Sequence, residues 1–160
     1  MSKLSHIDSE GRATMVDVTD KPYTSREAIA SGTIQMNDEA FEIAISRQAK
    51  KGDPIAIAEL AGIMAAKKTS DIIPLCHPLA LSSSKVSIVP KEHGILNVTA
   101  RVRTSAQTGV EMEALTAVTA ACLTVYDMLK AVDKEMLISD IKLLKKVGGK
   151  SGTYERLRND

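Results

Sequence analysis

Strict alternation of apolar and polar residues predicts two neighbouring strands in the middle of the chain. Residues 83–89 and 95–103 alternate in this way, and Lys91-Glu92-His93-Gly94 between them is typical of a hairpin turn. One face of the second segment gathers apolar side chains and is expected to face the core: Leu96, Val98, Ala100 and Val102.

A helical period follows over residues 110–132. Apolar residues recur there at spacings of three and four, which predicts an amphipathic helix, the longest of the chain. The residues of this stripe are Leu115, Val118, Cys122, Val125 and Leu129.

Two shorter helices are expected earlier in the chain. Asn37 is suited to cap a helix over 37–48, and Asp53-Pro54 is suited to begin one over 55–68. The second helix is apolar or Ala on nearly every side, and Glu59 is the only charge in its interior. We therefore expect it to be covered on more than one face, as in an oligomer.

The remaining strands complete the fold prediction. Residues 23–36 favour a strand in which Gly32 is typical of a bulge, and a last strand is expected at about 137–145. The order β-α-α-β-β-α-β predicts an α+β fold, a ferredoxin-like β-α-β-β-α-β sandwich with an extra helix. Its antiparallel sheet would carry the helices on one face.

Length and composition fit one domain over residues 1–160, with an N-terminal arm (1–21) and a flexible Gly/Lys tail (148–160). The net charge of +1 gives no reason to expect nucleic-acid binding. The polar N-terminus, the lack of any window near membrane-spanning length and only two cysteines indicate a cytoplasmic protein without a disulfide framework or a membrane partner.

Some segments could carry chemistry. Lys50-Lys51 precedes a capped helix, whose free N–H groups favour anions, although a solvated loop explains the lysines equally simply. In Pro74-Leu75-Cys76-His77-Pro78 the prolines hold His77 rigidly, for a structural or a functional reason. Adjacent Cys and His without further ligand spacing make a metal site improbable.

The long helix carries acids at both ends. Glu113 and Asp127 are fourteen residues apart, roughly 21 Å along the axis, so they cannot act on one reacting atom. Small residues separate them on one helical line (Thr116, Ala117, Ala120, Thr124). Either the ligand is long, or a neighbouring subunit completes the site. The acids have plainer explanations as well. Those at the start of the helix could compensate its dipole, and Asp127 could form a surface ion pair with Lys130.

The tail sequence Gly149-Lys150-Ser151 lacks the earlier glycine of a phosphate-binding P-loop, since Leu144 stands there. A basic lid and a disordered tail remain as alternatives for this segment.

Together these segments resemble the cyclic pyranopterin monophosphate synthase (MoaC) family of molybdenum-cofactor biosynthesis. The strings that carry the resemblance follow the family's order along nearly the whole chain: Met15–Val18, Lys51–Asp53, Pro74–Leu79, Thr108–Thr116, Tyr126–Met128 with Lys130, and Gly148–Gly152.

The resemblance implies that the chain converts a cyclised dihydro-GTP, made by a radical enzyme, into cyclic pyranopterin monophosphate and diphosphate. It implies catalytic roles for Asp127 as acid/base, Lys51 and Lys130. The substrate-binding residues it implies are Leu75, Cys76, His77, Glu111, Met112, Glu113 and Lys146. It also implies a homohexamer, a trimer of dimers with sites between subunits. No cofactor or metal is expected, and a transient hand-over from the radical GTP cyclase is a plausible partner contact.

Three other functions fit the sequence less well. An RNA-recognition module shares this strand order, but 83–89 and 95–103 contain no aromatic residue for base stacking. A nucleotide-storing or nucleotide-sensing oligomer would not need His77, Asp127 and several lysines at one interface. An acyl-transferring enzyme would use Cys76 as its nucleophile.

Overall fold

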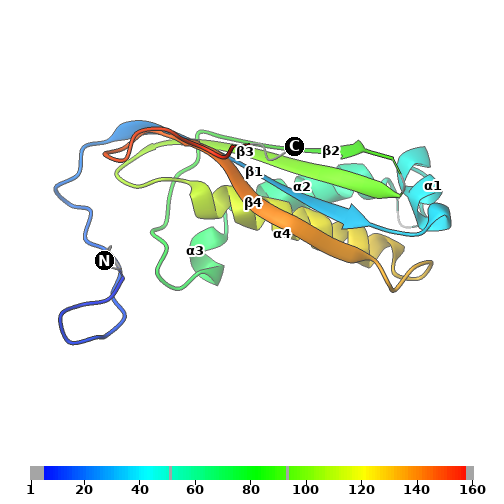
Figure 1. Ribbon diagram of the computed structural model, residues 1–160, viewed down its shortest axis with the longest axis horizontal. Coiled ribbons are helices and arrows are strands. Elements are labelled where there is room, and N and C mark those ends of the chain that lie inside the picture. The colour runs from blue at the N-terminus through cyan, green and yellow to red at the C-terminus, as the bar shows by residue number, and fades with distance from the viewer. Residues whose placement is uncertain (1–5, 51, 93, 158–160) are drawn as a thin grey trace.

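The computed structural model describes residues 6–50, 52–92 and 94–157. Its centre is a five-stranded sheet in the order β2-β3-β1-β4-β5, with every neighbouring pair antiparallel (Figure 1). The strands are β1 (Thr24–Gln35), β2 (Ser83–Pro90), β3 (Ile95–Ala106), β4 (Leu137–Val147) and β5 (Tyr154–Glu155). The first four follow the predicted strands closely, and β3 runs three residues further than expected.

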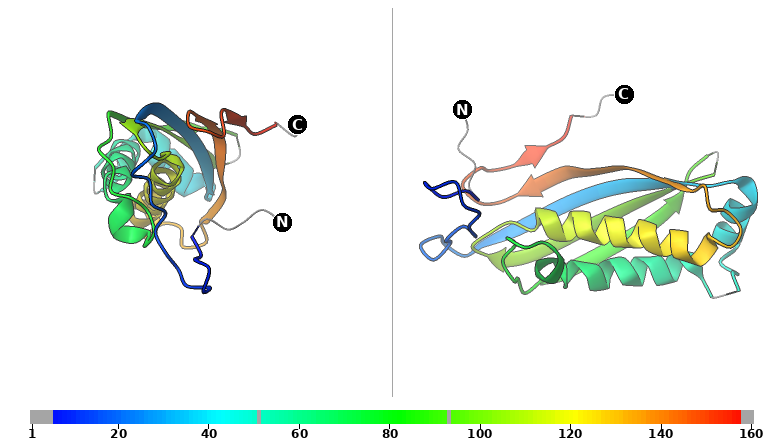
Figure 2. Two further views of the ribbon diagram at one scale, coloured as in Figure 1. Left: turned by 90° about the vertical axis from the view of Figure 1, so that its left-hand side faces the viewer. Right: turned by 90° about the horizontal axis from the view of Figure 1, so that it is seen from below.

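The helices lie on one face of this sheet, where α2 and α4 run side by side (Figure 2). The four helices are α1 (Asp38–Ser46), α2 (Pro54–Ala66), α3 (Thr69–Ile72) and α4 (Glu111–Leu129). Strand order and helix placement confirm the predicted ferredoxin-like α+β fold. The short α3 and β5 were not anticipated.

The capping residues act as the sequence predicted. Asn37 Oδ1 accepts a hydrogen bond from the Ala40 N–H at 2.8 Å, and Asp53 Oδ1 accepts from the N–H groups of Ile55 and Ala56 at 2.9 and 3.1 Å. These bonds satisfy N–H groups that have no partner within the first helical turn.

The apolar stripe of α4 faces the sheet. Val118, Cys122, Val125 and Leu129 are fully buried, whereas Leu115 is only partly buried. Gly32 lets this helix approach β1, because a Cβ there would lie 2.7 Å from Val118 Cγ1. The pairing of β1 with β4 is irregular between Ser31 and Thr33, which confirms the predicted bulge.

The line of small residues on α4 is only partly open to solvent. Ala117 is fully buried, and its carbonyl oxygen lies where α2 crosses, 2.8 Å from the position of a Cβ built on Gly62. Part of the line is therefore covered by α2 of the same chain. Thr116, Ala120 and Thr124 remain partly exposed.

The prediction that no window approaches membrane-spanning length was wrong, because α4 could cross a membrane by length and composition alone. Eight of its residues are buried within the fold, as expected for a core helix.

Candidate active site

Two adjoining cavities lie at the end of the molecule where α4 begins. This end also gathers the N-terminal arm (here residues 6–21), the loop after α3 and the turn between β4 and β5 (Figure 1). We call the first the His77 cavity, of about 320 Å³. Six of its lining residues are ones that the sequence predicted: Leu75, Cys76, His77, Glu111, Met112 and Glu113.

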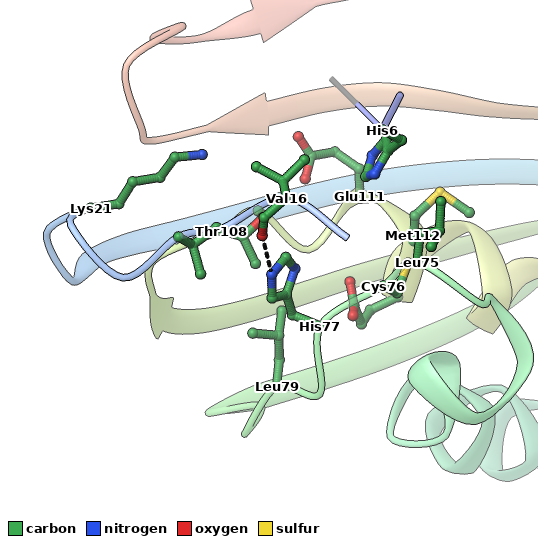
Figure 3. Close-up of a pocket in the computed structure, with 13 residues that line it drawn as sticks. His6, Val16, Lys21, Leu75, Cys76, His77, Leu79, Thr108, Glu111 and Met112 are labelled. Atoms are coloured by element: carbon green, nitrogen blue, oxygen red, sulfur yellow. Dashed lines mark hydrogen bonds between the residues drawn. The ribbon is translucent and has the colours of Figure 1, made fainter. Parts of the chain in front are cut away.

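His77 is held by the N-terminal arm. Its Nε2 lies 2.7 Å from the backbone carbonyl oxygen of Val16, the contact drawn as a dashed line in Figure 3. A carbonyl oxygen only accepts, so Nε2 must carry the proton of this bond. In a neutral ring the other nitrogen, Nδ1, is then unprotonated and can accept a proton.

Glu113 supplies a buried carboxyl group to the same cavity. It is only 4% exposed, and this burial raises its pKa to about 7, with a further contribution from the negative charge of Glu111. Near neutral pH the group therefore exists in both protonation states. A carboxyl group with this pKa is suited to general acid/base catalysis.

Cys76 is a poor nucleophile in this setting. Burial raises the pKa of its thiol, and the neighbouring Glu113 carboxylate raises it further. Reactive cysteines have lowered pKa values because the thiolate is the attacking form. The raised thiol pKa thus argues against an acyl-transferring enzyme.

The second cavity, about 680 Å³, is basic in character, and we call it the basic cavity. It shares Lys21, Thr108, Gly109 and Glu111 with the His77 cavity, so the two form one elongated site. Its cationic side chains come from separate parts of the chain: Lys21, Arg26, Lys146 and Lys150.

Polar atoms in the basic cavity are held ready for a ligand. Arg26 donates from Nη2 to the Gln107 carbonyl oxygen at 3.3 Å, and Lys146 donates to Ser151 Oγ. Among the described residues, however, Arg26 Nε and Thr24 Oγ1 are buried without a hydrogen-bond partner. Buried polar groups are normally satisfied, so two residues that line this cavity keep unused hydrogen-bonding capacity.

Two of the three predicted catalytic residues, Asp127 and Lys130, do not join this site within one chain. Asp127 and Lys130 form an ion pair of 2.7 Å at the opposite end of α4, and the pKa of Lys130 is raised by its hydrogen bond to Asp127. The third, Lys51, lies outside the residues that the structure describes. Glu113 and Asp127 thus lie near opposite ends of one helix, as the sequence predicted.

The sequence analysis missed several residues that line the site, chiefly His6, Lys21 and Arg26. Lys21 closely follows the Met15–Val18 string, a signal that could have identified it. In the part of the chain that the structure describes, no three His, Cys, Asp or Glu side chains are gathered as metal ligands.

Comparison with known proteins agrees with this geometry. The MoaC family matches residues 15–149 of the chain. A cyclic pyranopterin monophosphate synthase of Thermoanaerobacter sp. (strain X514) is 54% identical over 154 residues, which cover 96% of this chain and 98% of that protein. These matches confirm the resemblance drawn from the motifs, and the chain belongs to the MoaC family of enzymes.

Proposed function

We propose that the chain converts a cyclised dihydro-GTP into cyclic pyranopterin monophosphate and diphosphate, an early step of molybdenum-cofactor biosynthesis. The observation that carries the proposal is the continuity of the His77 cavity with the basic cavity through Lys21, Thr108, Gly109 and Glu111. One end offers groups that exchange protons and the other offers cations. A ring system carrying a triphosphate has this same division.

The acid/base end accounts for the ring chemistry. Opening the guanine ring and closing the pyranopterin require several proton transfers, for which Glu113 and His77 are placed. The cationic end accounts for the phosphate chemistry, because negative charge develops as diphosphate leaves. Lys21, Arg26 and Lys146 can stabilise that charge.

We further propose that a second copy of the chain brings Asp127 and Lys130 to this site. Support comes from the exposed apolar side chains of α2, since Leu60 is 57% and Met64 58% exposed, and from Leu123 of α4, 55% exposed. Because α2 and α4 pack against each other, these exposed apolar side chains offer a surface for a subunit contact. The homohexamer fits this arrangement, with Asp127 as the catalytic acid/base and Lys130 beside it.

The role of Lys51 and the hand-over from a radical enzyme stay predictions from the resemblance. The cytoplasmic location stays a prediction from the composition of the chain.

The first test is a single-turnover reaction of the purified chain with cyclised dihydro-GTP, following diphosphate and cyclic pyranopterin monophosphate. Asp127→Asn should form no product. Asp140→Asn is the matched control, because Asp140 is also an exposed carboxylate paired with a lysine, Lys142, at 3.6 Å. A folded native chain that forms no product would refute the proposed activity.

The second test asks whether two subunits build the site. Glu113→Gln and Asp127→Asn are mixed after unfolding and refolded together. If one chain supplies Glu113 and another Asp127, about one quarter of the sites in random oligomers regain both native groups. Activity near that fraction supports the shared site, whereas a mixture as inactive as its components places both groups in one subunit.

A further inference from the structure

Residues 16–21 of the N-terminal arm are fastened to the body of the protein by a side chain that belongs to none of the functional motifs. Gln107 donates from Nε2 to the carbonyl oxygen of Thr19 at 3.0 Å and to that of Lys21 at 2.9 Å. Both protons of its amide are therefore directed at the arm. Gln107 is half-buried and directly follows β3.

The fastened segment also carries hydrogen bonds of its own. The Asp17 carboxylate accepts hydrogen bonds from the Thr19 N–H at 2.9 Å and from the Thr19 hydroxyl at 2.6 Å. This turn joins the carbonyl held by Gln107 to the Val16 carbonyl that accepts from His77. A continuous series of hydrogen bonds and backbone links therefore connects Gln107 to His77 through Thr19, Asp17 and Val16.

The last hydrogen bond of this series, between Val16 and His77, determines the tautomer of the His77 ring. A neutral imidazole has two tautomers, and the hydrogen bond made by one nitrogen selects between them. The Val16 carbonyl requires the proton on Nε2 and so leaves Nδ1 as the acceptor. If the arm moved away, nothing in this contact would favour that tautomer over the other.

We propose that Gln107 is a positioning residue that fixes the tautomer of His77 through the arm. By holding the Thr19 and Lys21 carbonyls, Gln107 keeps the Val16 carbonyl against Nε2, and Nδ1 is thereby kept ready to accept a proton from the substrate. This role rests on the proposed function only for its effect on turnover. Its effect on His77 is a property of the free protein.

Gln107→Met is the decisive variant, because methionine keeps the length of the side chain and loses both donors. Gln107→Lys keeps an N–H donor and serves as the conservative rescue. Gln48→Met makes the same substitution at an exposed glutamine beyond α1 and serves as the control. Nitrogen-15 NMR of the imidazole rings is recorded well above the usual histidine pKa of about 6.5. Comparison with His77→Asn assigns the His77 signals among the three histidines.

In the native protein the two His77 nitrogens should show the separated signals of a single tautomer with Nε2 protonated. Gln107→Met should bring both signals toward the average of the two tautomers, and Gln107→Lys and Gln48→Met should keep the native pattern. In turnover, Gln107→Met should lower kcat by about tenfold with little change in KM.

The proposal is overturned if Gln107→Met, folded as judged by its backbone spectrum, keeps the native nitrogen signals, even where its turnover falls. An inactive native chain with the expected change in signals would instead refute the proposed function and leave the role of Gln107 in place.

Discussion

Replacing Glu113 with glutamine should stabilise the protein at alkaline pH while abolishing its proton transfer. The carboxyl group is 4% exposed, and burial raises its pKa from 4.5 to about 7. Ionising it in place opposes folding, because the charge loses its hydration and faces Glu111. Glutamine has nearly the same shape and cannot ionise, so it resembles the protonated acid.

The sign and size follow from the two pKa values. Between pH 4.5 and about 7 the folded state holds the Glu113 proton and the unfolded state releases it. The native protein therefore loses stability as pH rises through this window, and the loss is complete above the folded pKa. A difference of about 2.5 pH units at about 1.36 kcal/mol each sets an upper limit of about 3 kcal/mol.

Urea unfolding at one protein concentration measures this effect directly. We expect the free energies of unfolding of the native chain and Glu113→Gln to agree at about pH 5 and to diverge by up to about 3 kcal/mol at about pH 9, with the variant more stable. Glu39→Gln, an exposed carboxylate in the first turn of α1, is the control and should show no such divergence. If the free energies of unfolding of Glu113→Gln and the native chain changed in parallel with pH, the raised pKa of Glu113 would be refuted.

Three further predictions concern Cys76 and the helices. Iodoacetamide should alkylate Cys76 more slowly than free cysteine at neutral pH, because burial and Glu113 raise the thiol pKa; rapid labelling seen by mass spectrometry would contradict this. Gly62→Ala should lower the melting temperature, because the added Cβ would lie 2.8 Å from the Ala117 carbonyl oxygen. An unchanged melting temperature would show that α2 can shift. Asp53→Ala should lower the free energy of unfolding by about 1 kcal/mol through loss of the α2 cap, and Asp53→Asn by less.

The fold was predictable because its local signals agree with its tertiary packing. Alternation marked β2 and β3, the three-and-four spacing marked α4, and Asn37 and Asp53 marked helix starts that the structure confirms. The short elements were missed for a physical reason. α3 has four residues and β5 two, too few for a hydrophobic period to emerge, and both depend on contacts with distant parts of the chain.

The site was predictable only where its residues belong to short sequence motifs. The segment around His77 and the start of α4 were identified together, and the structure places them in one cavity. Lys21 and Arg26 escaped notice because their importance comes from tertiary proximity to Lys146, far along the chain. Lys21 has the Met15–Val18 string nearby as a signal, whereas no motif beside Arg26 distinguishes it from a solvated basic residue.

The opposite ends of α4 show why one chain offers only part of the proposed chemistry. Glu113 is buried and its pKa is raised, whereas Asp127 is exposed and paired with Lys130 at 2.7 Å. An exposed ion pair in water contributes little by itself, but its electrostatic effect grows once it is removed from solvent. A second subunit that covered Asp127 and Lys130 would make that change at the moment of assembly. The proposed interface therefore would both complete the site and create the environment in which its second acid/base group becomes effective.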